Sequence, residues 1–469
     1  MAKKRNTQMT LPVTGFDIFS RYIRFFHDNI YYRKVYTEKK ENIPSDVPLM
    51  IVSNHQNGLN DALGLFFSVR SATNRRVKMI TRADVFQYPF ARRFLRWLGL
   101  LPAFRLSFEG EESLANNAET FALTEEELLN NGTIVVFPEA GHQDKRWLGK
   151  FSHGYLRILF EAAAKSNFEK ELFILPSCNH YSDYFGLQEQ LLIRYGTPVS
   201  IAPYYELYQT KPRTAQRQLN ALIWKQISDM MLNITDLDNY STIDYLRNTY
   251  GIRYAEAKGF NPDSLPEKLN ADKQLFARLK TLKENRKELI EPLYDDVATL
   301  EKQTKKSRIN DRNFEIPIAL SKMILSSLLL IVLFPVFVVS LIPNGLIWLI
   351  PCLITGKIKD SMLHSSIRLV VSLLLTVPLF YGLTFLLVWF FTKSLIIALF
   401  HLLCLPFLGV FAWRYTKTWD KWIDKMRFYR LTKTGQLNDL IQLRSNIYRL
   451  LDKLLDISDN KKYKLKTEL

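Results

Sequence analysis

Residues 49–67 read LMIVSNHQNGLNDALGLFF and divide into three parts. The run from Leu49 to Val52 is apolar and partly β-branched, which predicts a short buried strand. A polar loop containing His55 follows, and Asp61 then opens an apolar segment of helical character. The stretch therefore predicts a histidine at the end of a strand and a carboxylate at the start of the next helix, a common place for site residues in α/β folds.

His55 and Asp61 allow two interpretations. A neutral imidazole can take a proton from a hydroxyl, and a carboxylate on its other nitrogen fixes the tautomer and stabilises the imidazolium. The alternative is a loop histidine and a helix N-cap aspartate with no mechanistic link. These two residues alone do not decide between the interpretations.

Three further segments follow in one order. They are GLLPAFR at 99–105, TIVVFPEAG at 133–141 and LFILPS at 172–177. With the first stretch, this series resembles the glycerolipid acyltransferase family, which carries an N-H-x4-D block, a glycine–arginine block, an F-P-E-G block and a strand ending in proline. The resemblance covers roughly residues 15–250, and four blocks in order are more specific than any one of them.

The first block departs from the usual family spacing. An H-x4-D pattern would place the aspartate at position 60, where this chain has Asn60, and Asp61 stands one residue further on. Fungal-type glycerol-3-phosphate acyltransferases resemble this longer H-x5-D form, with an asparagine two residues after the histidine, as at Asn57. The resemblance therefore implies His55 as general base and Asp61 as its partner, with Asn57 among the substrate-binding residues.

The resemblance also implies a substrate-binding set in the later blocks. Arg105 would hold the acceptor phosphate, because a planar guanidinium binds phosphate oxygens bidentately; a surface arginine is the alternative. Glu139, in the loop with Gly141, is assigned to the acceptor hydroxyl or to loop organisation, and a carboxylate satisfied by backbone donors is compatible with either. The family's arginine after this loop is missing, and three basic residues are candidates to replace it: Lys145, Arg146 and Lys150.

The other histidines and the cysteines point to no competing site. His142 and His153 have no carboxylate at a matching spacing, and we interpret His180 as a structural loop residue. The three cysteines form no ligand spacing, so neither a zinc site nor a disulfide framework is expected. No serine or cysteine stands in a nucleophile arrangement such as G-x-S-x-G, which argues against a hydrolase and a covalent acyl-enzyme.

Charge and hydropathy point to a membrane. The chain has 469 residues and a formal net charge of +17, and a basic excess favours either nucleic acid or an anionic membrane surface. Long apolar stretches favour the membrane, and no nucleic-acid-binding motif is present. The basic start, residues 1–5, has no apolar segment after it, so we expect no cleavable signal peptide and a catalytic half on the cytoplasmic side.

The apolar part lies near the C-terminal end. Residues 316–355 are almost wholly apolar, enough for two crossings at about 20 residues each, although Pro335, Pro343 and Pro351 offer broken or re-entrant pieces instead. Residues 369–391 and 394–413 are further spanning candidates. Flanking Lys and Arg favour two hairpins with both flanks cytoplasmic; a buried soluble bundle is disfavoured by so much uninterrupted apolar sequence.

Two amphipathic segments flank these regions. Residues 14–34 show apolar residues at helical spacing with basic neighbours, which predicts either an interfacial anchor or a helix packed on its own domain. Residues 417–455 are predicted as a helix that lies on the membrane surface or self-associates.

The predicted fold class is α/β: an acyltransferase-type sandwich of mixed sheet with flanking helices, followed by a helical segment and an α-helical membrane domain. The expected regions are an N-terminal amphipathic helix and lead-in (1–45), the acyltransferase core (46–235), a charged helical connector (236–313), membrane-embedded helices (314–413) and a C-terminal amphipathic, cytoplasmic helix (414–469).

The predicted function is transfer of a fatty acyl group to a hydroxyl of glycerol 3-phosphate or 1-acylglycerol 3-phosphate in phospholipid biosynthesis. Acyl-CoA or acyl carrier protein would be the co-substrate, and neither a metal nor another cofactor is expected. The partners are then membrane lipid and the glycerophosphate acceptor, with no nucleic acid; the oligomeric state stays open. The alternatives are another lysophospholipid acceptor or a non-catalytic membrane scaffold that retains the fold.

Overall fold

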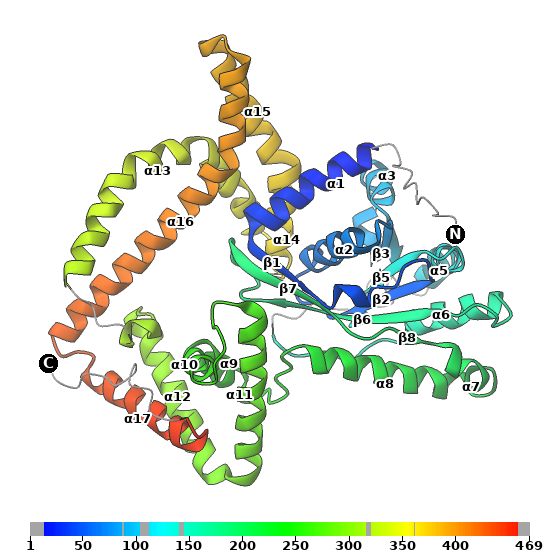
Figure 1. The fold of residues 1–469 in the computed structure, drawn as a ribbon, viewed down its shortest axis with the longest axis horizontal. Helices are drawn as coiled ribbons and strands as arrows, with labels where there is room; N and C mark the ends of the chain where they lie inside the picture. The colour runs from blue at the N-terminus through cyan, green and yellow to red at the C-terminus, as the bar shows by residue number, and fades with distance from the viewer. Residues whose placement is uncertain are drawn as a thin grey trace, which may run out of the picture.

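The computed structural model describes residues 14–86, 89–103, 112–139, 145–315, 320–360 and 362–457. Within these residues an eight-stranded sheet of order β1-β7-β6-β2-β5-β3-β4, with β8 beside β6, forms the centre of one part of the molecule (Figure 1). The strands are β1 Tyr32–Glu38, β2 Leu49–Ser53, β3 Val77–Arg82, β4 Leu100–Ala103, β5 Thr133–Val136, β6 Phe173–Tyr181, β7 Glu189–Tyr195 and β8 Val199–Ser200.

Strand β2 occupies the middle of the sheet. It pairs in parallel with β5 on one side and with β6 on the other, and all five of its residues are buried. This explains the continuous apolar run, because a central parallel strand is covered on both faces. Strand β6 pairs antiparallel with β7, so the sheet is mixed, and the predicted fold class is confirmed.

Helices cover both faces of the sheet, as the alternation of side chains in β2 requires. Met50 and Val52 point toward a core made with α6 and α8, whereas Leu49 and Ile51 point toward a core made with α2. The helices of this part are α1 Gly15–Phe25, α2 Leu59–Thr73, α3 Pro89–Trp97, α5 Glu112–Leu129, α6 Gly154–Lys165, α7 Tyr205–Thr210 and α8 Pro212–Met230.

Strand β6 does not end at Pro176, as the sequence had suggested, but continues to Tyr181. The strand changes neighbours at this point: residues 173–174 pair with β8 and residues 177–181 pair with β7. Pro176 lies between the two antiparallel pairings, so its missing N–H interrupts neither of them. The extension carries Asn179 and Tyr181 to the edge of the sheet where His55 lies.

The predicted helix 14–34 is shorter than expected. It consists of α1 and a short π-helix, η1 (Phe26–Tyr31), after which the chain enters the sheet as β1. Ile23, Phe26 and Ile30 pack in one cluster with Phe67 of α2 and with residues of the apolar helices. The segment is therefore packed between the sheet domain and the apolar helices, and the sheet begins before residue 46.

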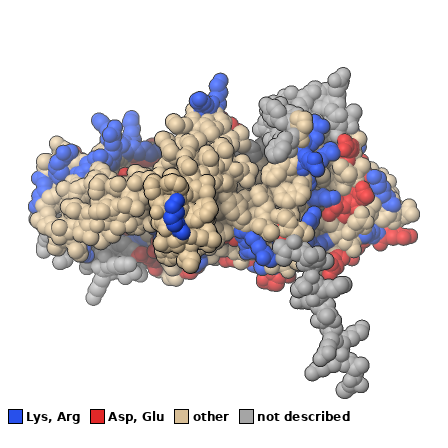
Figure 2. Space-filling model, turned by 90° about the horizontal axis from the view of Figure 1, so that it is seen from above, with Lys and Arg blue, Asp and Glu red and all other residues tan. Residues whose placement is uncertain are grey.

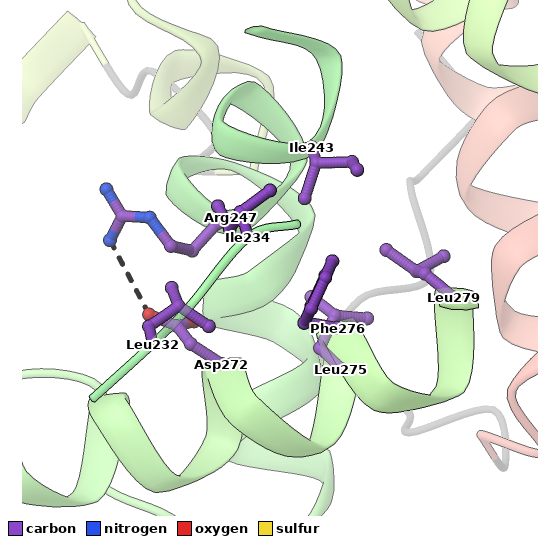
Figure 3. A pocket seen from close by; sticks show the side chains of 8 residues that line it. All are labelled: Leu232, Ile234, Ile243, Arg247, Asp272, Leu275, Phe276 and Leu279. Atoms are coloured by element: carbon purple, nitrogen blue, oxygen red, sulfur yellow. Dashed lines mark hydrogen bonds and ion pairs between the residues drawn. The ribbon is translucent and has the colours of Figure 1, made fainter. Parts of the chain in front are cut away.

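A separate helical unit follows the sheet domain. Its core joins α9 Tyr240–Asn248, α10 Tyr250–Ala257, α11 Leu265–Asn285, α12 Lys287–Ser307 and the C-terminal helix α17 Asn438–Leu454. A cavity of about 10 Å³ inside it is lined by apolar side chains and by Arg247 and Asp272, whose charged groups lie 3.5 Å apart (Figure 3). That volume suits one water molecule and no substrate.

Residues 417–455 thus form two elements with different surroundings. The first part belongs to α16 (Leu395–Lys433), which runs through the expected boundary at residue 413, and the second part is α17. Arg444 of α17 bonds to the carboxylate of Asp311 at 2.9 and 2.8 Å, and Tyr448 donates to the same carboxylate at 3.0 Å. The C-terminal helix therefore completes the core of the 236–313 unit.

Three helices of the described chain are long and apolar enough to cross a membrane: Leu320–Thr355, Leu363–Thr392 and Leu395–Lys433. The first is the single helix α13, where the sequence had suggested two crossings or broken pieces. The second comprises α14 Met362–Val371, the π-helix η6 Ser372–Thr376 and α15 Val377–Thr392. From above, the surface over these helices carries few charged side chains, and Lys and Arg gather at one edge (Figure 2).

Candidate active site

His55 lies two residues beyond the end of β2, where the parallel strands of the sheet present their carboxyl ends. Its ring stacks on Phe137, just beyond β5, with 4.3 Å between centroids and an 18° interplanar angle. Its side chain is 14% exposed, so the ring is held in place yet reachable from solvent. Two neighbouring strand ends thus position the imidazole.

Asp61 contacts the imidazole directly. Its Oδ2 lies 2.9 Å from His55 Nδ1 and also accepts the backbone N–H groups of Gln56 and Asn57 at 2.8 and 2.7 Å. Its Oδ1 accepts the hydroxyl of Tyr181 at 2.6 Å. The carboxylate is fully buried, and these four contacts, with its place in the first turn of α2, offset the cost of burying its charge.

This arrangement assigns the tautomer of His55. A proton on Nδ1 is donated to the Asp61 carboxylate, and Nε2 is then the nitrogen able to accept a proton. An imidazole oriented by a buried carboxylate has the geometry of a general base.

The geometry also distinguishes Asp61 from Asn60. The Asn60 amide is directed away from His55 and donates to Asn57 Oδ1 at 3.2 Å and to Ser365 Oγ at 2.8 Å. Between histidine and carboxylate the chain passes through Gly58 at φ +51° and ψ −125°, a backbone conformation that L-residues with a side chain avoid. The turn at this glycine gives the longer loop room to bring Asp61 back to His55.

Asn57 holds this loop from inside. Its side chain is buried, donates to the backbone oxygen of Tyr184 at 2.9 Å and accepts from Asn60. The geometry gives it a structural role, and a contact with substrate stays a prediction.

Glu139 ties the His55 loop to the segment that follows β5. Its two carboxylate oxygens accept the backbone N–H groups of His55 and Gly149, each at 2.8 Å. Burial raises the pKa of Glu139, and the two backbone hydrogen bonds act in the opposite direction. The structure therefore shows the loop-organising role that the sequence allowed, and an acceptor-binding role stays a prediction.

The basic candidates beside this loop differ in their surroundings. Arg146 is buried, with its guanidinium donating to the backbone oxygens of Tyr181 and Ser182, so it serves to hold the end of β6. Lys145 and Lys150 are exposed, and the backbone oxygen of Lys145 accepts from Gln56 at 3.0 Å. Lys145 thus lies next to the His55 loop, and Lys150 directly follows Gly149, which Glu139 links to that loop.

Three predicted residues have no described geometry. Arg105, Gly141 and His142 lie outside the described residues, in the ranges 104–111 and 140–144. Of the remaining histidines, His153 is exposed at the start of α6, and His180 is buried beside Arg146. Burial and the nearby arginine lower the pKa of His180 well below its usual value, which fits a neutral structural residue. His180 lies within strand β6, however, and not in the predicted loop.

Several residues of the site were not singled out from the sequence. Tyr181 ends β6 and Phe137 follows β5 directly, and a single aromatic residue at a strand end carries no signal of such a role. Ser365 and Ser366 of α14 lie some 300 positions from the loop they contact. Only the packing of the chain reveals these partners.

Comparisons with known proteins fit this geometry. The profile of the family described as Acyltransferase matches residues 34–179, which include β1, β2, β5 and the His55 loop. This part of the chain is therefore similar to the acyltransferase family.

A curated relative of the acyltransferase domain is glycerol-3-phosphate O-acyltransferase 2 from Saccharomyces cerevisiae, 25% identical over 136 residues. The match spans 29% of this chain and only 18% of the yeast protein. Among solved structures, the 1-acyl-sn-glycerophosphate (LPA) acyltransferase PlsC from Thermotoga maritima is similar, with 17% identity and a TM-score of 0.29 over 44% of this chain and 79% of that one. A similarity this distant does not relate the two active sites residue by residue.

Proposed function

We propose that this protein transfers a fatty acyl group from acyl-CoA or acyl carrier protein to a hydroxyl of glycerol 3-phosphate. The observation that carries the proposal is the contact between His55 and the buried Asp61 at the end of β2, inside the acyltransferase domain. The H-x5-D spacing and the similarity to a yeast enzyme named for glycerol 3-phosphate support this acceptor over 1-acylglycerol 3-phosphate.

The reaction follows from the geometry of the pair. Nε2 of His55 takes the proton of the acceptor hydroxyl as its oxygen attacks the thioester carbonyl carbon, and Asp61 stabilises the imidazolium that forms. The tetrahedral intermediate then collapses, the carbon–sulfur bond breaks, and the imidazolium returns the proton to the leaving thiolate. The products are an ester and a free thiol, and the transfer needs no covalent acyl-enzyme.

The acceptor phosphate requires cationic partners. Arg105 is proposed to bind it, with Lys145 or Lys150 adding charge and Gly141 allowing close approach of the loop backbone. Lys145 and Lys150 are exposed next to the loop held by Glu139, which makes them available to a ligand.

The function is tested by acyl transfer with purified, detergent-solubilised protein. Acyl-CoA and acylated acyl carrier protein are each offered with glycerol 3-phosphate or with 1-acylglycerol 3-phosphate, and the lipid products are separated. We expect 1-acylglycerol 3-phosphate to form from glycerol 3-phosphate. Product from the acylated acceptor alone would reassign the step, and no product in any combination would favour a scaffold that retains the fold.

We further propose that the catalytic domain faces the cytoplasm and that only two of the three apolar helices cross the membrane. Residues before α13 pack against the C-terminal part of α16 and against α17: Asn310 and Asn313 bond to Asp424 of α16, and Arg444 of α17 bonds to Asp311. Both chain segments therefore lie on one side of the membrane. Three complete crossings would separate them, so the number of crossings must be even.

The helix that does not cross is α13. Trp422 and Tyr415 of α16 donate to Ser327 Oγ and to the backbone oxygen of Leu330, while the middle of α13 reaches Leu405 through Asn344. Leu405 is separated from the turn at Lys393 by about 18 Å along the helix axis. The contact at Asn344 therefore lies well below the tip of the hairpin. In Figure 1, α13 bends over, whereas α15 and the start of α16 project together as a hairpin. With Pro335 and Pro343 inside it, α13 is a bent, re-entrant helix.

Single cysteines test this topology in a background where Cys178, Cys352 and Cys404 are replaced by serine. Lys357→Cys, Lys393→Cys and Lys433→Cys each change an exposed residue and are labelled with a membrane-impermeant thiol reagent in sealed vesicles of both orientations. We expect positions 357 and 433 to react from the cytoplasmic face and position 393 from the other. Labelling of position 357 from the face opposite to position 433 would mean that α13 crosses.

A further inference from the structure

Helix α14 contacts the active-site loop and leads into the hairpin formed by α15 and the start of α16, which we call the apolar hairpin. The chain reaches it after α13 and continues from it through η6 into α15. Ser365 and Ser366, in the middle of α14, are 1% and 5% exposed. Both side chains are turned toward the loop between His55 and Asp61, where they make hydrogen bonds with its backbone and side chains.

The two hydroxyls contact three residues of that segment: Asn57, Leu59 and Asn60. Ser366 Oγ accepts the backbone N–H of Leu59 at 2.8 Å and donates to the backbone oxygen of Asn57 at 3.2 Å. Ser365 Oγ accepts the side-chain amide of Asn60 at 2.8 Å and also contacts the Tyr31 hydroxyl. The segment from Asn57 to Asn60 is thus held from outside the sheet domain.

We propose that α14, through Ser366 and Ser365, is a positioning element that sets the geometry of the His55–Asp61 pair. The inference rests on the proposed acyl transfer and adds to it a dependence on a segment far away in the sequence. It assigns a purpose to the extra residue of the H-x5-D loop: Asn60, at the position of the usual aspartate, is the side chain that binds α14.

Asp61 links the position of the loop to the imidazole of His55. The carboxylate receives the backbone N–H groups of Gln56 and Asn57, which belong to the same loop that Ser366 holds at Asn57 and Leu59. If the loop shifts, these donors move and the carboxylate follows them away from Nδ1 of His55. A displacement of about 1 Å in a catalytic group can cost about 100-fold in rate, so a small change at α14 has a large effect.

Helix α14 also ties the active-site loop to the apolar helices, because the chain passes from α14 through η6 into α15. Tyr22 of α1 donates to the backbone oxygen of Leu373 in η6 at 2.9 Å, and the hairpin begins directly beyond it. The loop is therefore fixed by the segment that leads into α15. The geometry of the His55–Asp61 pair therefore depends on the position of the hairpin formed by α15 and the start of α16.

The test compares Ser366→Thr with Ser366→Val in the full-length protein. The two side chains have nearly the same shape, but only threonine retains the hydroxyl. Thr384→Val is the control, because Thr384 bonds only within its own helix, to Tyr381 at 3.1 Å. For each variant we measure kcat and KM for acyl transfer, the melting temperature in detergent, and amide hydrogen exchange of the peptide covering residues 54–61.

We expect Ser366→Val to lower kcat about 10-fold relative to Ser366→Thr, with the acceptor KM and the melting temperature nearly unchanged. Exchange in residues 54–61 is expected to rise in the valine variant alone. Equal kcat values for the two variants, or a loss that follows the melting temperature, would overturn the proposal. If the wild-type protein shows no transfer, the proposed function fails, whereas hydrogen exchange still decides whether α14 holds the loop.

Discussion

Substitution of His55 by alanine is expected to lower kcat for acyl transfer by about 1,000-fold or more. General base catalysis contributes about 100- to 10,000-fold, and within the described residues no second histidine contacts Asp61. The side chain lies at the end of β2, where its ring packs on Phe137, outside the main cores of the sheet domain. We therefore expect expression, membrane insertion and the acceptor KM to change little.

The control for this experiment is His153→Ala. His153 is exposed at the start of α6 and should tolerate alanine with transfer close to that of the wild type. Steady-state kinetics at saturating thioester, with circular dichroism to verify folding, provide the comparison. Residual activity of His55→Ala within 10-fold of wild type would refute its role as the base.

Substitution of Asp61 by asparagine should be nearly as damaging, with a loss in kcat on the order of 1,000-fold. The amide has the shape of the carboxylate: its oxygen can accept from Gln56, Asn57 and His55 while its NH2 group donates to the Tyr181 oxygen. The packing is therefore retained, but the negative charge that stabilises the imidazolium is lost. The effect should appear in kcat, because the interaction strengthens in the transition state.

Asn60→Ala is the matched comparison for the two possible spacings. Asn60 does not touch His55 and bonds to Asn57 and Ser365, so alanine should weaken the hold of α14 and cost about 10-fold or less. Kinetics of both variants, with melting temperatures, separate the two roles. A large loss of kcat in Asn60→Ala together with a small loss in Asp61→Asn would show that Asp61 is not the catalytic partner of His55.

The sequence predicted those features that depend on a local pattern. The apolar run at Leu49 implied a buried strand, the polar break after it implied a site loop, and β2 is the central strand with His55 at its end. The strand and the loop follow from a short stretch of chain, where hydrophobic period and turn residues act directly. The mixed sheet and its flanking helices were expected only from the resemblance to the acyltransferase family.

The failures have a common cause. Pro176 did not end β6, residues 320–355 form one continuous helix and not separate pieces, and residues 417–455 divided between α16 and α17. In each case a distant neighbour decides the outcome: β8 and β7 on either side of Pro176, α16 against α13, and Asp311 beneath Arg444. Local propensity cannot report on neighbours that only the fold brings near.

The sequence alone determined that this chain contains a histidine and carboxylate in a strand–loop–helix setting and a long apolar segment. The resemblance to the H-x5-D form pointed to Asp61 as the partner of His55, and the structure places the two in contact. Only the tertiary structure decided that Ser365 and Ser366 of α14 hold the loop between them. Spacing along the chain gives the order of functional groups. Their distances depend on backbone turns such as that at Gly58 and on hydrogen bonds between segments some 300 residues apart, and these exist only once the chain has folded.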